Sequence, residues 1–211
     1  LQVHPSATEL LPLMEAAVQA VRSLATNKGI AVEYAKIDPD LEVNADGDRV
    51  VGAAEMTHDL DELVFISSDA QLLHFPAASV RPQGRSGGGM AGIKLAPKAS
   101  VVFFGVSRLA DSVVVSVAGS SSALPGTDAG SVKVTPFDEY PGKGRGTGGV
   151  RCQRFLKGED VLQLAWVGAT PAVAAAASGS PIELPAIDAR RDASGTSVGQ
   201  PIAAVSTRYH A

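Results

Sequence analysis

The chain has 211 residues, of which 45% are hydrophobic and 19% charged, which suffices for a buried core and excludes wholesale disorder. Its one cysteine excludes a disulfide framework and any zinc site built from several cysteines. No apolar stretch reaches the roughly 18 residues of a membrane span, and no basic-then-apolar leader opens the sequence, so we expect a cytoplasmic protein without a membrane partner.

The charge is distributed unevenly along the chain, whose formal net charge is −4. Residues 1–75 contain 4 basic and 13 acidic side chains, residues 76–160 contain 11 and 6, and residues 161–211 contain 3 of each. A basic segment within an acidic chain indicates a surface that attracts a polyanion. An ordinary solvated surface explains the same excess equally well, so charge alone leaves both interpretations open.

The first expected element is an amphipathic helix at about 8–27. Ser6, followed three residues later by Glu9, forms a capping box, and Gly29 supplies a stop signal. The apolar residues recur every three or four positions, which places them on one helix face. They are Leu10, Met14, Ala17, Val18, Val21 and Leu24.

From residue 30 the pattern changes to short β-rich runs separated by Gly, Pro, Asp or Ser, which predicts a mainly β fold such as a sandwich, barrel or propeller. The expected strands are 30–35, 49–53, 63–67, 71–75, 100–106, 112–117, 131–135, 161–167, 181–184 and 202–205. Among the residues of these expected strands, His74 is expected to face the surface and Trp166 to pack in the core. Cys152, outside the strands, is expected to be a small structural side chain. No His, Cys, Asp or Glu set has metal-ligand spacing, so no metal is expected.

An internal repeat is the most informative feature of the sequence. At one constant offset and without a gap, Pro76 aligns with Pro136, Gly84-Arg85 with Gly144-Arg145, Gly88-Gly89 with Gly148-Gly149, and Lys94 with Arg154. A degenerate third copy runs from Pro185 through Arg190-Arg191 to Gly195. Such a period is typical of propeller-like blades, in which each repeat packs on its neighbours.

The repeat predicts how the chain is organised. Its period, about 50–60 residues, is that of a propeller-like blade. Blades are expected at 48–97, 98–157 and 158–206, followed by a frayed tail at 207–211. Residues 1–47, with the helix and one strand, form a separate segment of uncertain origin.

The glycine-arginine loops suit phosphate, because glycines expose backbone N–H groups and arginine offers a planar fork for phosphate oxygens. The alternative is that the glycines only form tight corners and the arginines only aid solubility. We expect Gly88 and Gly148 to adopt positive φ. Arg85 and Arg145 are expected to occupy equivalent positions in neighbouring blades. The candidate DNA-binding residues are Arg81, Arg85, Lys94, Lys98, Lys133, Lys143, Arg145, Arg151, Arg154 and Lys157.

These runs resemble the C-terminal β-pinwheel domain of the A subunit of bacterial type IIA topoisomerases, DNA gyrase and topoisomerase IV. The similar segments are 47–53, 63–69, 81–85, 92–95, 133–137, 149–151, 153–155 and 164–166. The resemblance implies a partial β-pinwheel whose basic rim wraps double-stranded DNA for strand passage. It also implies a nucleoid-associated location.

The same resemblance implies partner subunits and restricts the activity expected of this chain alone. The topoisomerase A-subunit core and the B subunit would be partners, and ATP and Mg would be needed in other domains, with no cofactor in this chain. The family's catalytic tyrosine lies upstream, so Tyr34, Tyr140 and Tyr209 are not candidates and the chain is not expected to be active alone. The glutamine-arginine-rich box of gyrase is missing, which favours topoisomerase IV unless a missing first blade carried it.

Residues 1–49 instead resemble the opening of a sensor histidine kinase ATPase domain, in the runs Lys28–Glu33 and Asp46–Arg49. The asparagine-bearing helix that this family needs for Mg-ATP does not follow, so ATP binding has no support. Three hypotheses therefore remain at this stage. The chain is a DNA-wrapping topoisomerase domain, a propeller-like protein-interaction module with an acidic docking surface, or the remnant of a sensor kinase.

Overall fold

The computed structural model describes residues 51–54, 56, 58, 60–83, 88–124 and 126–207, together with two short strands before them. The chain divides into two compact units, Leu1–Val50 and Val51–Ala211. In the first unit, β1 (Thr8–Glu9) pairs antiparallel with β2 (Glu42–Val43). Thr8 and Glu9 thus form a strand where the expected helix would begin, and the rest of that helix lies outside the described residues.

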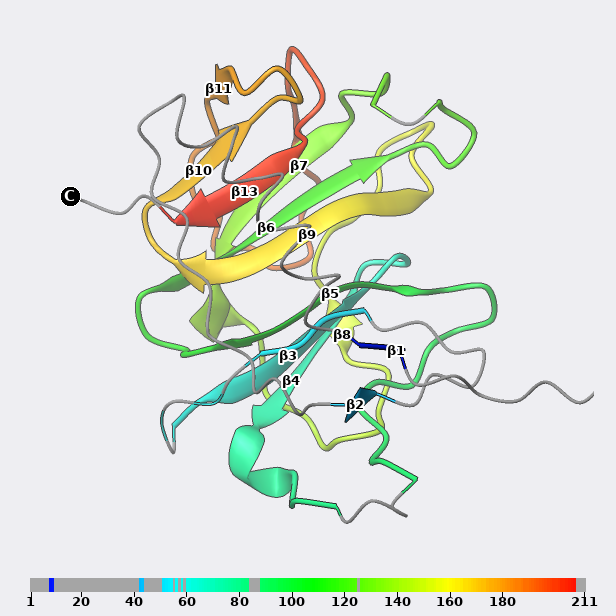
Figure 1. Cartoon of the computed structure of the whole chain (residues 1–211). Coiled ribbons are helices and arrows are strands. Elements are labelled where there is room, and N and C mark those ends of the chain that lie inside the picture. Colours follow the sequence, from blue (N-terminus) through cyan, green and yellow to red (C-terminus); the bar gives the residue numbers. More distant parts are fainter. Residues whose placement is uncertain are drawn as a thin grey trace, which may run out of the picture. The chain divides into compact units, whose positions relative to one another are not determined.

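The described part of the second unit contains three antiparallel sheets (Figure 1). The first sheet has the order β5-β3-β4-β8, the second has the order β9-β6-β7-β12, and the third has the order β13-β10-β11. In the first sheet the strands are β3 (Glu62–Ser67), β4 (Gln71–Pro76), β5 (Val101–Ser107) and β8 (Val150–Arg151). In the second they are β6 (Ser112–Gly119), β7 (Ser131–Pro136), β9 (Val161–Ala169) and β12 (Thr196–Ser197). In the third they are β10 (Ala172–Ala175), β11 (Pro181–Ile182) and β13 (Ala204–Thr207).

The internal repeat is visible in the backbone. β4 is followed by the 3-10 helix η1 (Ala77–Ser79), and β7 is followed by the 3-10 helix η2 (Phe137–Glu139). The prolines before these helices adopt nearly the same conformation, with φ −55° and ψ 130° at Pro76 and φ −56° and ψ 140° at Pro136. The first two sheets also share one strand order, so their repeats are structural equivalents.

Each of these two sheets takes its outer strand from a later repeat. Arg151 of β8 pairs with Gln71 of β4, and Ser197 of β12 pairs with Ser131 of β7. The strands β5 and β9 likewise pair with the hairpins that precede them, β5 with β3 and β9 with β6. The repeats are therefore interleaved, since each of the first two sheets contains strands from more than one repeat.

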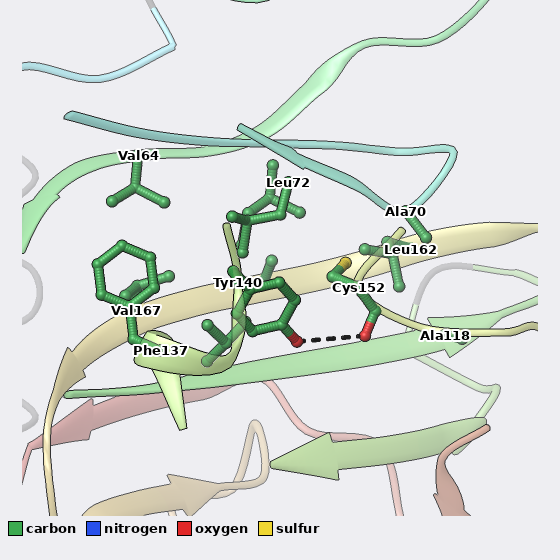
Figure 2. Close-up of a cluster of buried hydrophobic side chains, with 12 residues drawn as sticks. Val64, Ala70, Leu72, Ala118, Phe137, Tyr140, Cys152, Leu162 and Val167 are labelled. Atoms are coloured by element: carbon green, nitrogen blue, oxygen red, sulfur yellow. Dashed lines mark hydrogen bonds between the residues drawn. The ribbon is translucent and has the colours of Figure 1, made fainter. Parts of the chain in front are cut away.

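The sheets stack through apolar faces. Between the first and second sheets lies a cluster drawn in Figure 2, to which β3 and β4 contribute Val64 and Leu72, and β9 contributes Leu162 and Val167. A second cluster joins the second sheet to the third through residues such as Val115 and Ala174. All eight residues of β6 are buried because both faces of the second sheet are covered.

Burial on both faces explains why one sequence-based expectation was wrong. His74 was expected to face the surface, but it is 2% exposed; its Nδ1 lies 2.9 Å from Glu62 Oε2 and its Nε2 lies 2.8 Å from the carbonyl of Tyr140. The alternation of residues along a strand distinguishes buried from exposed positions only when one face of the sheet meets water. Cys152 is buried as expected, and burial raises the pKa of its thiol to about 12.

Other differences concern short elements. Residues 51–53 form no strand, whereas β10 and β12 were not predicted as separate strands. Among the described residues, no helix is long and apolar enough to cross a membrane, and no cluster of three or more His, Cys, Asp or Glu side chains is placed to hold a metal ion.

Candidate nucleic-acid interface

The glycine-rich loop of the second repeat, residues 141–149, lies along the outer edge of the first sheet. The backbone amide of Lys143 donates a hydrogen bond to the carbonyl of His74 (3.1 Å), and β8, which follows the loop, pairs with the start of β4. Lys143 and Arg151 are thus held beside positions 74 and 71 of one strand, which are about 10 Å apart at 3.3 Å per residue. The edge of the first sheet fixes the spacing of two basic residues.

The same loop contacts the corresponding loop of the first repeat. The amide of Lys94 donates to the carbonyl of Thr147 (2.9 Å), and the amide of Gly146 donates to the carbonyl of Gly92 (2.5 Å). The Arg145 guanidinium donates through Nη1 to the carbonyl of Ala91 (3.1 Å). Two glycine-rich segments that belong to different repeats and are distant in sequence therefore lie side by side.

We call the four basic residues at this junction the edge cluster; its members are Lys94, Lys143, Arg145 and Arg151. All four are exposed, and the sequence has no Asp or Glu in residues 81–94 or 141–154. Lys143 Nζ donates only to the carbonyl of Gly149 (3.1 Å) among the described residues, and the one bond of Arg145 leaves most of its five N–H donors available. Such an arrangement suits an extended anion with several phosphate groups.

Glycine is required in these loops one residue later than the sequence suggested. Gly89 and Gly149 both have φ of +75°, whereas Gly88 and Gly148 do not adopt positive φ, so the expectation for Gly88 and Gly148 was wrong. At Gly149 an added Cβ would lie 2.4 Å from the carbonyl oxygen of Leu72, because the loop approaches β4 closely there. In each Gly-Gly pair, the second residue makes the turn.

The remaining candidates lie elsewhere on the surface. Arg81 is exposed just after η1, and Lys98 and Lys157 are exposed in equivalent turns before β5 and β9. Arg154 is exposed, but its Nη2 lies 3.9 Å from Asp192 Oδ2. Arg85 lies outside the described residues, so its expected equivalence to Arg145 stays a prediction.

Lys133 must be withdrawn from the candidates because its side chain is buried. The residue is 3% exposed, and its Nζ donates to Thr135 Oγ1, to the carbonyl of Cys152 (3.3 Å) and to the carbonyl of Arg191 (3.0 Å). These oxygens replace water around the ammonium, so no phosphate is needed as a partner. Desolvation by burial lowers the pKa of Lys133 from its usual 10.5 to about 8.

This pKa predicts a pH-dependent stability. Between pH 8 and 10.5 the unfolded chain binds more protons at Lys133 than the folded chain, so the free energy of unfolding rises as the pH increases through 8. We expect a contribution of about 1 kcal/mol between pH 7 and 9. The measurement is urea unfolding at pH 7, 8 and 9 for the parent and for Lys133→Met. The difference between the two profiles isolates the lysine from other groups, and parallel profiles would contradict the assignment.

Stacked antiparallel sheets, equivalent repeats that exchange short strands, and basic glycine-rich loops at a sheet edge together define a β-pinwheel. The family model for the DNA gyrase C-terminal domain, a β-propeller, matches residues 61–108 and 126–165. These segments make up less than half of the chain, and over them it is similar to the C-terminal domains of type IIA topoisomerase A subunits. Recognition from the sequence and the mainly β pinwheel fold are both confirmed.

Two relatives show the extent of the similarity. The topoisomerase subunit TopoM of Mycolicibacterium smegmatis is 36% identical over 108 residues, which are 51% of this chain and 14% of that protein. The DNA gyrase A subunit of Salmonella typhimurium is 35% identical over 105 residues, which are 50% of this chain and 11% of that protein. The chain therefore matches only a small part of each relative's length.

Two solved structures share the fold. The C-terminal domain of DNA topoisomerase IV superposes with a TM-score of 0.54 at 18% identity, covering 70% of this chain and 46% of that one. The Escherichia coli ParC C-terminal domain gives a TM-score of 0.53 at 18% identity, covering 72% of this chain and 62% of that one. Both comparisons support the β-pinwheel architecture.

Proposed function

We propose that residues 51–207 bind double-stranded DNA along the edge cluster and serve as a DNA-wrapping domain of a type IIA topoisomerase. The observation that carries the proposal is the meeting of two glycine-rich loops from different repeats, which places four exposed basic side chains at one sheet edge without an acidic residue in either loop. Phosphates along a duplex provide the repeated negative charge that such an edge attracts.

The chemistry of the edge favours contact with the DNA backbone over reading of bases. None of the aromatic side chains among the described residues is exposed, so no stacking platform is offered to a base. Lysine and arginine contacts to phosphate fix the position of a duplex but carry no sequence information directly. We therefore propose sequence-tolerant binding.

The proposed domain presents DNA to catalytic parts that lie in other segments of the enzyme. Tyr140 is not suited to be a nucleophile, because it is 2% exposed, its hydroxyl donates to the carbonyl of Cys152 (3.4 Å; Figure 2) and burial raises its pKa. Contacts with an A-subunit core and a B subunit, the use of ATP and Mg by those parts, and a nucleoid-associated cytoplasmic location all follow from the same proposal.

Salt dependence tests the proposal. We expect the affinity for a 40-base-pair duplex to fall with a log–log slope of about −3.6, or roughly 100-fold between 50 and 200 mM salt, if four phosphates are neutralised. Fluorescence anisotropy with two duplexes of unrelated sequence is the measurement, and both should give the same dissociation constant. A slope near zero, or a strong preference for one duplex, would refute binding through phosphate contacts.

A further inference from the structure

The outer edge of the second sheet is built like that of the first but carries different charges. The amide of Lys143 donates to the carbonyl of His74 in the first sheet, and the amide of Asp188 donates to the carbonyl of Val134 (2.8 Å) in the second. Positions 74 and 134 are equivalent in the internal repeat, so Asp188 occupies the place of Lys143. Ser197 likewise stands where Arg151 stands, because each pairs with the first residue of β4 or β7.

The loop that carries Asp188, residues 185–195, is held firmly at this edge. The buried ammonium of Lys133 donates to the carbonyl of Arg191 (3.0 Å), and the amide of Arg154 donates to the carbonyl of Ala193 (3.1 Å). An added Cβ at Gly195 would lie 2.9 Å from the backbone nitrogen of Val132, which shows how closely the loop approaches β7. The backbone of the loop, from which Asp188 and Asp192 project, therefore keeps a defined place on the edge.

Two aspartates in this loop engage the basic side chains around them. Asp188 accepts from both Nε (3.0 Å) and Nη2 (2.9 Å) of Arg190. Its hydrogen bonds with Arg190 lower the pKa of Asp188 to about 2, so the carboxylate stays charged at any pH at which DNA binding is measured. Asp192 lies 3.9 Å from the Arg154 guanidinium.

The loops consequently differ in net charge. Residues 81–94 hold three basic and no acidic side chains, and residues 141–154 hold four and none. Residues 185–197 hold Arg190 and Arg191 against Asp188 and Asp192, which leaves no net charge. A duplex following the edges of successive sheets would meet a positive edge first and then a neutral one with two fixed carboxylates.

We propose that Asp188 and Asp192 end the DNA-binding track at the edge of the second sheet. They occupy Arg190 and Arg154 and repel the phosphate backbone, so that DNA contacts the edge of the first sheet but not that of the second. This inference rests on the proposed DNA binding and adds where the contact stops.

The test is the double variant Asp188→Asn/Asp192→Asn in the full chain. Asparagine keeps the side-chain oxygen that accepts from the Arg190 amide (2.9 Å), so the loop conformation is retained while both negative charges are removed. With Arg190 and Arg154 free for phosphate, we expect the log–log salt slope to steepen by about 1 to 2. Affinity for a 40-base-pair duplex at 100 mM salt should rise by roughly 5- to 20-fold, as expected for one or two added charge-assisted contacts.

The control is Asp111→Asn/Glu183→Gln, which changes the net charge equally at two exposed residues that form no ion pair among the described side chains. Its salt slope should equal that of the parent. If the parent binds with the expected slope but the aspartate variant behaves like the control, this inference is overturned and the proposed function stands. If the parent shows no salt-dependent binding, both are overturned.

Discussion

Removing all four charges of the edge cluster together should nearly abolish DNA binding. In the variant Lys94→Gln/Lys143→Gln/Arg145→Gln/Arg151→Gln, we expect affinity at low salt to fall by about 30- to 1000-fold, since four partly solvated charge-assisted contacts are lost. The salt slope should lose almost all of its magnitude, because each phosphate contact contributes about 0.9. Fluorescence anisotropy over a salt series measures both quantities.

The fold should survive this variant, because exposed charges contribute little to stability and the backbone hydrogen bonds of the loops remain. An unchanged urea midpoint verifies this. A control is Arg108→Gln. The Arg108 guanidinium lies 3.5 Å from Asp61, and residue 108 lies outside both glycine-rich loops. This substitution should change the affinity for DNA less than about twofold. Tight binding by the fourfold variant would show that DNA follows a different surface.

Replacing Gly149 with alanine should lower the free energy of unfolding strongly. The residue has φ of +75°, which strains an L-amino acid by about 1–2 kcal/mol. In addition, its new Cβ would lie 2.4 Å from the carbonyl oxygen of Leu72, which is backbone and cannot move without disturbing β4. We expect a loss of about 3 kcal/mol or more in the free energy of unfolding, measured in urea.

The neighbouring Gly148→Ala is the control for this change. Gly148 does not have positive φ, and the nearest atom to an added Cβ is the carbonyl oxygen of Lys94 at an ordinary 3.7 Å. Its effect should stay within about 1 kcal/mol, because a compatible alanine also restricts the unfolded chain. Equal losses from the two substitutions would mean that the loop does not depend on the left-handed turn.

The repeat and most strands were predictable because they rest on local signals. A constant offset without gaps reports equivalent backbone paths, and β-rich runs bounded by turn residues mark hairpins such as β3–β4. Two residues carry no periodicity, so neither the strand β12 nor the pairing partner of β8 was predicted from the sequence. Their place is decided by pairing with β4 and β7, strands that lie far earlier in the chain.

The site was only partly predictable for a related reason. The sequence alone does not show whether a basic residue meets water or the interior. Lys133 lies within β7, and the carbonyls of Cys152 and of Arg191, the latter from the next repeat, enclose its ammonium, whereas Lys143 lies in an exposed loop. Asp188 was missed although its signal was present. The degenerate third copy has as many acidic as basic residues, and its lack of net charge indicated a different role.

If the domain wraps DNA as proposed, the exchange of β8 between repeats also determines where mechanical load from the bent duplex would enter the protein. Arg151, a member of the edge cluster, lies on the two-residue strand that joins the second repeat to β4 of the first. Tension on a phosphate bound there would act directly on that short pairing and on the close approach of Gly149 to Leu72. A duplex that springs back towards straightness would therefore pull on the junction between repeats, and in the proposed function the stiffness of this junction would limit how tightly the domain holds a bend.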